Sequence, residues 1–136
     1  MTTDDDIRQI LTTVKTIAVV GFSANPDRPS NEVAAFLKRK GFRVIPVNPG
    51  LAGQSFLGER VYATLKDIPF TVDMVDVFRA SEYVAAVMDE AISIRAKVVW
   101  TQLDVVDETA AEKGRAAGLS VVMNRCPAIE MPRLGL

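Results

Sequence analysis

The stretch IAVVGFS, residues 17–23, decides the fold class. Residues 17–20 form a short, uninterrupted apolar run rich in β-branched side chains, which is typical of a parallel strand buried on both faces. Gly21 then permits a tight turn. Ser30 is placed to cap a following helix, which we expect to end before Gly41. The stretch therefore predicts a strand–turn–helix unit.

The rest of the chain repeats this alternation. We expect further strands at residues 44–47, 72–77, 98–100 and 121–123, a brief edge strand at 60–62, and helices at 7–14, 84–91 and 107–117. Strands that alternate with helices predict parallel pairing with right-handed crossovers. The predicted class is α/β: a three-layer, Rossmann-like, doubly wound sheet of order 3-2-1-4-5-6, forming a single domain over residues 1–136.

In such a sheet the ligand crevice opens at the carboxyl ends of the strands where the winding reverses. Here that point lies between the first strand and the fourth. We therefore expect residues 21–23 to face Phe78 and Arg79 across one cleft.

Composition excludes several classes of function. The net charge of −1 gives no long-range attraction for nucleic acid, so any anion site is local. No apolar run reaches the roughly 18 residues that span a bilayer, and the acidic Asp4 to Asp6 do not fit a secretory signal. Cys126 has no partner cysteine in the chain. We expect a cytoplasmic protein with no membrane association.

The chain contains 0 histidines, so the commonest general base and metal ligand is missing. Asp73 and Asp76 lie three apart in a predicted strand and point to opposite faces, so they do not form an acid–base pair. Glu130 and Arg133 are expected to form an exposed ion pair. These observations predict no catalytic residues and no metal site.

The predicted crevice suits a phosphate. Backbone N–H groups after Gly21, the Ser23 hydroxyl and the Arg28 guanidinium could all contact phosphate oxygens beside a helix N-terminus. Residues 21–26 contain one glycine, so the dinucleotide fingerprint is absent. The second strand is followed by Asn48 and Pro49, without the carboxylate that holds the ribose of NAD.

Without that carboxylate, a ribose that carries a phosphate is no longer repelled. Coenzyme A carries such a phosphate on its adenosine ribose. Its candidate partners are the basic residues Arg28, Lys38, Lys40, Arg43 and Arg79. Phe78 and Arg79 could stack on a base and bind phosphate; alternatively, Phe78 lies in the core and Arg79 on the surface.

Several short segments, in order, resemble the stand-alone CoA-binding proteins. They are Val20 to Ser23, Arg28 to Ser30, Pro46 to Pro49, Val77 to Arg79, Trp100 to Gln102 and Asn124 to Cys126. That family is similar to the N-terminal domain of the succinyl-CoA synthetase alpha subunit and of ADP-forming acyl-CoA synthetases. The likeness covers nearly the whole chain.

The resemblance implies a site for CoA. Phosphates would be received by Gly21, Phe22, Ser23, Arg28, Pro29 and Ser30; the nucleotide pocket would be lined by Asn48, Pro49, Phe78 and Arg79; and Thr101 and Gln102 would follow the pantetheine path. Leu51 stands near the position of a synthetase lysine. The synthetases' phosphorylated histidine has no counterpart here, so their chemistry is not implied.

We therefore expect non-catalytic binding of CoA or acyl-CoA. The alternatives are an NAD(P)-linked oxidoreductase and a regulatory or interaction subunit with an empty cleft. A homodimer or a protein partner is compatible with each. Cys126 is either a small buried residue or a thiol that exchanges with that of CoA.

Overall fold

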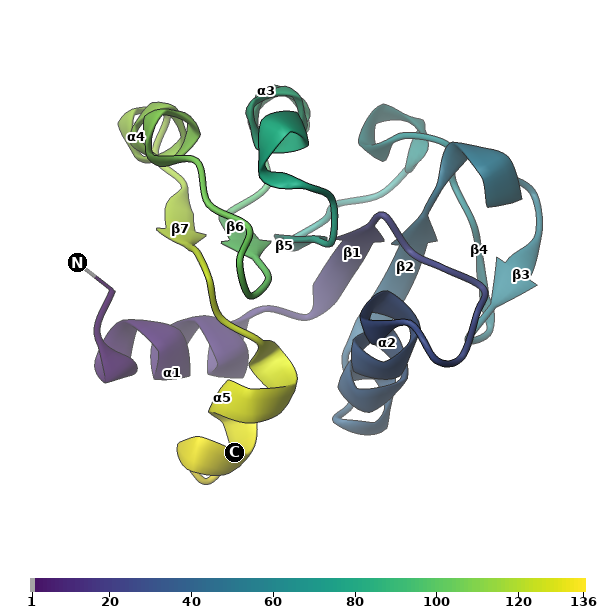
Figure 1. The fold of residues 1–136 in the computed structure, drawn as a ribbon, viewed down its shortest axis with the longest axis horizontal. Coiled ribbons are helices and arrows are strands. Elements are labelled where there is room, and N and C mark those ends of the chain that lie inside the picture. Colours follow the sequence, from purple (N-terminus) through teal and green to yellow (C-terminus); the bar gives the residue numbers. More distant parts are fainter. Residues whose placement is uncertain (1) are drawn as a thin grey trace.

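The computed structural model describes residues 2–136, and its centre is a five-stranded parallel sheet of order β2-β1-β5-β6-β7 (Figure 1). The strands are β1 (Thr16–Val20), β2 (Arg43–Val47), β5 (Met74–Val77), β6 (Val98–Thr101) and β7 (Ser120–Val122). In β5 and β6 every residue is buried, as expected for strands covered on both faces.

Helices cover both faces of the sheet and give three layers (Figure 1). Helices α3 (Val84–Ser93) and α4 (Glu108–Ala116) lie on one face and share an apolar core with Ala18, Val75 and Val99. Helices α1 (Asp4–Thr13), α2 (Pro29–Arg39) and α5 (Pro127–Arg133) lie on the other. Their core includes Ile17, Met74 and Trp100. The predicted α/β class and layering are confirmed.

Short elements complete the chain between the second and fifth strands and before α3. They are the 3₁₀ turns Pro49–Leu51, Leu65–Asp67 and Ser81–Tyr83, and the antiparallel hairpin of β3 (Ser55–Phe56) and β4 (Glu59–Arg60). The hairpin lies beyond β2 at one end of the molecule (Figure 1). It is not part of the central sheet.

The predicted third strand of the sheet is wrong. Tyr62 forms only one isolated parallel bridge, with Val47, so the order begins at β2. The carbonyl of Pro46 accepts from Tyr62 N at 3.1 Å, so this side of Pro46 faces the outer edge. A residue's N–H and C=O point to the same side of a strand, and proline has no N–H there. Pro46 therefore removes a donor that a full third strand would need.

The start of one helix and the presence of another also differ from the prediction. Helix α2 begins at Pro29 with Arg28 as its N-cap, so Ser30 lies within the first turn and is not the cap. Proline at the first helical position is favourable because its missing N–H has no partner there in any case. Helix α5 was not predicted: its Pro127 and Pro132 suggest a loop, yet the helix forms over residues 127–133.

No helix within residues 2–136 is long and apolar enough to cross a membrane.

Candidate functional site

The ends of β1 and β5 meet at Gly21. Its φ is +86°, and a Cβ placed there would lie 3.0 Å from Arg79 Cγ and 3.1 Å from the carbonyl oxygen of Phe78. The N–H of Phe78 donates to Val20 O at 2.9 Å. The predicted juxtaposition of Gly21 with Phe78 and Arg79 is therefore present, and only glycine fits this approach without strain.

A cavity of about 330 Å³ opens beside this contact, between the ends of β1 and β2, residues 63–65 and helix α3. Its volume is within the usual range of small-molecule sites. The residues around it are Val20, Gly21, Val47, Asn48, Pro49, Ala63, Thr64, Leu65, Arg79, Tyr83, Ala86, Val87 and Glu90. The cavity thus lies where the winding of the sheet reverses.

Arg79 is the cation of this cavity. Its guanidinium stacks on the Tyr83 ring, with Cζ 4.0 Å from the ring centroid, and the Tyr83 side chain is itself exposed. Arg79 forms no ion pair with a carboxylate among residues 2–136, so its donors are free for a ligand. Stacking on tyrosine holds the planar group in place while its edge stays available.

Asn48 ties the end of β2 to the loop after β1. Its Nδ2 donates to Phe22 O at 2.7 Å, and its Oδ1 accepts from Gly50 N at 2.8 Å. Both polar atoms of the side chain are therefore engaged in shaping the cavity wall. Asn48 and the exposed Pro49 line the cavity.

The backbone amides of the loop after β1 are already hydrogen-bonded to other parts of the protein. The N–H groups of Gly21 and Phe22 donate to Val47 O at 3.1 and 3.3 Å, and that of Ser23 donates to Ser30 Oγ at 2.9 Å. The Phe22 ring is buried against Phe56, with centroids 5.5 Å apart. In this conformation the three amides do not present free donors to a phosphate.

Arg28 remains exposed at the start of α2. Its backbone carbonyl accepts from Asn31 N and Glu32 N, while its side chain makes no capping hydrogen bond. The guanidinium is therefore free, beside the Pro29 and Ser30 that open the helix.

Phe78 and Arg79 separate onto opposite sides of the sheet. Phe78 packs against the core that α1, α2 and α5 cover, whereas Arg79 lines the cavity on the α3 side. Of the two alternatives for Phe78, the structure places it against the core. It leaves Arg79 exposed in the crevice.

Thr101 is the last residue of β6 and Gln102 follows it; both lie outside the 330 Å³ cavity. The Thr101 hydroxyl is buried and donates to Val105 O at 2.6 Å. Gln102 is 7% exposed, and its Nε2 donates to Asp76 Oδ1 at 2.8 Å. The side chains of these two residues therefore bind the end of β6 to the following turn and to β5.

Asp76 is fully buried in β5. Burial raises the pKa of its carboxyl to about 7, although the Gln102 hydrogen bond acts to lower it. Its Oδ2 is the one enclosed side-chain oxygen or nitrogen within residues 2–136 that lacks a hydrogen-bond partner. An atom of this kind typically costs about 1–3 kcal/mol of stability.

Cys126 is buried at the N-terminal end of α5. Burial raises the pKa of its thiol; the N–H groups of Ala128 and Ile129 act to lower it, and the charges of Asp76 and Glu130 raise it. A raised pKa keeps the thiol protonated and weakly nucleophilic. The structure favours the small buried residue over an exchanging thiol.

Glu130 corrects the expectation of an exposed ion pair. It is 5% exposed, and its carboxylate accepts from Arg125 Nη1 at 2.8 Å and Arg133 Nε at 2.6 Å. Burial alone would raise the pKa of Glu130, but these two arginines hold it below its usual value. The buried Glu130 carboxylate, held by the more exposed Arg125 and Arg133, anchors the C-terminal helix.

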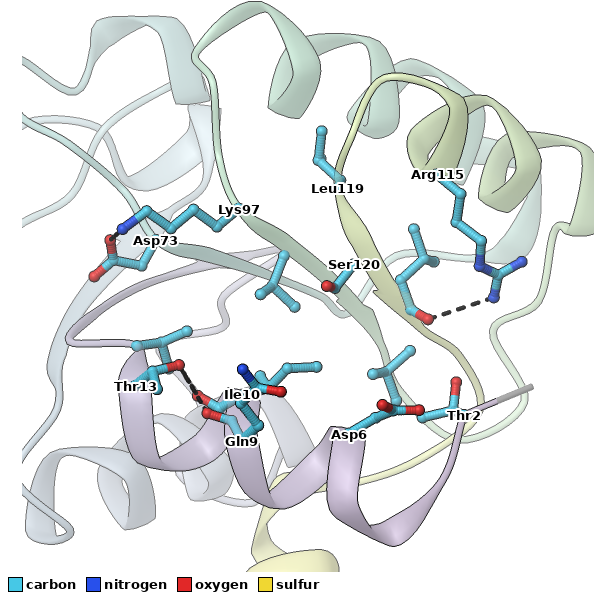
Figure 2. A pocket seen from close by; sticks show the side chains of 14 residues that line it. Thr2, Asp6, Gln9, Ile10, Thr13, Asp73, Lys97, Arg115, Leu119 and Ser120 are labelled. Carbon is cyan, nitrogen blue, oxygen red and sulfur yellow. Dashed lines mark hydrogen bonds and ion pairs between the residues drawn. The ribbon is translucent and has the colours of Figure 1, made fainter.

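A larger concavity, of about 460 Å³, lies at the amino ends of the strands between α1 and β7 (Figure 2). Its charged groups are paired with the protein itself. Lys97 Nζ lies 3.7 Å from Asp73 Oδ1, and Arg115 Nη2 donates to Val121 O at 3.4 Å. The crevice at the carboxyl ends, with its free guanidinium, is the better ligand site.

Sequence reasoning missed three polar residues of the cavity: Thr64, Tyr83 and Glu90. Tyr83 had a recognisable signal, because it stands four residues after Arg79 at the start of a predicted helix, a spacing that brings side chains together. Thr64 lies in the irregular segment after β4, where no periodicity fixed its place. No group of three or more metal-ligating side chains occurs within residues 2–136.

Fold and cavity together define a Rossmann-like α/β protein with a ligand crevice at the carboxyl edge of its sheet. Within that class, the chain belongs to the CoA-binding domain family, whose model matches residues 15–132. It is similar to YneT of Bacillus subtilis (strain 168), with 38% identity over 121 residues, 89% of this chain and 88% of that protein.

Solved structures share this fold. A hypothetical protein from Pyrococcus horikoshii OT3 is 40% identical, covers 99% of this chain with 94% of its own, and superposes with a TM-score of 0.93. A dinucleotide-forming acetyl-coenzyme A synthetase 1 of Ca. Korarchaeum cryptofilum, in complex with phosphate and ADP, shares the fold. Its TM-score is 0.67 at 23% identity, over 88% of this chain and 27% of the synthetase.

Proposed function

We propose that this chain binds coenzyme A without catalysing its reaction, with the adenosine in the 330 Å³ cavity and phosphates on Arg79 and Arg28. The contact of Gly21 with the Phe78 carbonyl and the Arg79 side chain carries the proposal, because it brings an unpaired guanidinium to the mouth of the cavity. Membership of the CoA-binding domain family supports the choice of ligand.

The chemistry of the cavity suits a phosphorylated adenosine. Apolar Val20, Val47 and Val87 offer a surface for the base, and Glu90 offers an acceptor. Since the three amides after β1 are engaged, the phosphates depend on arginine side chains. Guanidinium groups bind phosphate by paired, charge-assisted hydrogen bonds.

Gly21, Asn48 and Pro49 weigh against an NAD(P)-linked oxidoreductase. The turn at Gly21 lacks the further glycines of the dinucleotide fingerprint. Both polar atoms of the Asn48 side chain are already hydrogen-bonded, to Phe22 O and Gly50 N, so they are not free for the ribose of NAD. The ionisable groups around the cavity are Arg79, Tyr83 and Glu90, and none of them has a base or nucleophile beside it in hydrogen-bonding contact.

The ligand is tested by calorimetry with CoA, dephospho-CoA, NAD and NADP. We expect CoA to bind most tightly and dephospho-CoA more weakly, because the latter lacks the ribose phosphate. Thermal unfolding should agree: ligand at a hundred times its dissociation constant adds about 2.7 kcal/mol of stability. Equal affinity for CoA and dephospho-CoA would exclude a role for the 3′-phosphate, and preference for NAD would overturn the proposal.

Arg79→Ala should weaken CoA binding by about tenfold to a hundredfold, since a hydrogen bond to a charged group contributes about 1.5–3 kcal/mol. The matched control is Arg39→Ala, which removes the same charge from the C-terminal end of α2. Calorimetry on both variants separates the local contact from the net charge. An equal effect of the two substitutions would contradict the assignment of Arg79.

A further inference from the structure

Glu90 is the one carboxylate among the residues that line the 330 Å³ cavity. It is half-buried, and its side chain forms no ion pair with a basic residue of the described chain, 2–136. The hydrogen bond that Ser93 Oγ donates to Glu90 reaches the backbone carbonyl, not the carboxylate. A partly buried carboxylate costs free energy unless a donor reaches it. The phosphates of a ligand bind cations, so they do not explain this anion.

The position of Glu90 along α3 separates it from the cation of the cavity. Tyr83, Val87 and Glu90 follow the spacing of one helix face, and all three line the cavity. Arg79 stacks on Tyr83, at the start of this face. At 1.5 Å of rise per residue, Glu90 lies about 10 Å farther along the helix than Tyr83. The cavity therefore has a guanidinium near one end and a carboxylate near the other, the order of phosphate and base in a nucleotide.

The other polar side chains away from Arg79 and Tyr83 also lack a free donor. Thr64 precedes the turn Leu65–Asp67, which packs beside α3. Its Oγ1 donates to Asp67 Oδ2 at 2.9 Å, so the hydroxyl keeps only its capacity to accept. The Asn48 amide donates to Phe22 O at 2.7 Å. A ligand edge that satisfies this part of the cavity must itself carry donors.

Purine bases differ in this respect at position 6. Adenine has an amino group there, which donates, whereas guanine and hypoxanthine have a carbonyl, which accepts. A bound base displaces water from Glu90, so a carbonyl at this point would leave the carboxylate without a donor and set two negative oxygens against each other. Sites built around such a hydrogen bond reject the analogue that lacks it, because the buried polar group is then unpaired.

We propose that Glu90 is a specificity residue: its carboxylate accepts a hydrogen bond from the 6-amino group of adenine, so that the cavity selects a 6-aminopurine over a 6-oxopurine. The inference rests on the proposed function, because it places the adenosine of CoA in this cavity. It adds to that function the residue that distinguishes one purine from another.

The test compares adenosine 3′,5′-bisphosphate with inosine 3′,5′-bisphosphate by calorimetry. The two differ in the base, where a 6-oxo group replaces the 6-amino group. We expect the wild type to prefer the adenosine compound by about tenfold to a hundredfold, the factor for a hydrogen bond to a charged group. In Glu90→Gln the preference should disappear, because a carboxamide can accept from an amino group or donate to a carbonyl.

The matched control is Glu82→Gln, which removes the same charge from an exposed position in the turn Ser81–Tyr83, outside the cavity lining. This variant should keep the wild-type preference. The inference is overturned if Glu90→Gln keeps the preference, if Glu82→Gln loses it equally, or if guanosine 3′,5′-bisphosphate binds the wild type as tightly as the adenosine compound. If the wild type binds neither CoA nor adenosine 3′,5′-bisphosphate, the proposed function itself fails; CoA binding with equal affinity for the adenosine and inosine compounds refutes only the role of Glu90.

Discussion

At the scale of single residues, Gly21 decides whether the crevice exists. Its positive φ turns the chain, and its missing side chain lets β1 and β5 end in contact. Arg79, on the other side of that contact, stacks on Tyr83 and keeps its donors free. Asp76 and Gln102 form a buried hydrogen-bonded pair that joins β5 to the residue after β6.

Gly21→Ala should destabilise the protein and impair CoA binding. The control is Gly41→Ala: Gly41 also has a positive φ, of +99°, but a Cβ there has nothing within 4 Å. Gly41→Ala should therefore cost only the left-handed conformation, about 1–2 kcal/mol, and leave binding intact. Urea unfolding and calorimetry on both variants measure the difference. Equal stability losses would show that the approach of Phe78 and Arg79 is not tight.

The Asp76 carboxyl should make stability fall with rising pH. Its pKa is raised from 3.8 to about 7 in the folded state, so its contribution is full below 3.8 and is lost as pH climbs towards 7. The stability of the wild type relative to Asp76→Asn should decline over this window and then level off. Urea midpoints between these pH values measure it.

Asp73→Asn is the matched control for that pH series. Burial would raise the pKa of Asp73, but the N–H groups of Thr16 and Lys15 and the charge of Lys97 lower it below 3.8. Its contribution is therefore present above 3.8 and lost only in more acidic solution. A decline with rising pH in the Asp73 comparison, or none in the Asp76 comparison, would contradict these assignments.

At the scale of elements, the packing of α4 depends on Gly114. A Cβ there would lie 2.6 Å from Met88 Sδ and 3.1 Å from Val121 Cγ2, so α4 sits close to both α3 and the sheet. We expect Gly114→Val to lower stability by about 2 kcal/mol, through overpacking. Ala116→Val, at an exposed position of the same helix, should cost much less. Thermal unfolding compares them; equal losses would argue for helix propensity alone.

The main elements were predictable from the sequence because their signals are local. The apolar run at residues 17–20, the helix-ending Gly41 and the periodicity of residues 84–91 each fix an element without distant contacts. The third strand was mispredicted because Pro46 blocks the edge that Tyr62 would need. Helix α5 was missed because its two prolines suggest a loop. The hydrogen bonds that Arg125 and Arg133 donate to Glu130 help to hold the helix, and the sequence pattern does not predict them.

At the scale of the whole molecule, the two ends of the chain are joined through one network. Arg133 donates to Asp4 of α1 at 2.8 Å and to the buried Glu130 of α5 at 2.6 Å, and Arg125 donates to the same glutamate. The network fastens α5 beside α1, on the face of the sheet opposite α3 and α4 (Figure 1).

Glu130→Ala should lower the stability of the molecule by about 2 kcal/mol, because it removes the buried carboxylate that accepts hydrogen bonds from Arg125 and Arg133 and leaves a void in its place. Asp4→Asn should change little, since its ion pair is exposed and screened by solvent. Urea unfolding at neutral pH measures both. A loss in Asp4→Asn as large as that in Glu130→Ala would show that the exposed arm of the network carries the stability.

The sequence alone determined the alternation of buried strands and amphipathic helices, the turn at Gly21, and a crevice that lacks a dinucleotide fingerprint. These follow from neighbours in the chain, whose spacing sets burial and turn geometry. Tertiary structure decided which donors stay free: it paired the amides of Gly21, Phe22 and Ser23, paired the Gln102 amide with Asp76, and left the Arg79 guanidinium exposed. Whether a donor is paired or free depends on hydrogen bonds between separate segments of the chain, and these cannot be predicted from local sequence patterns.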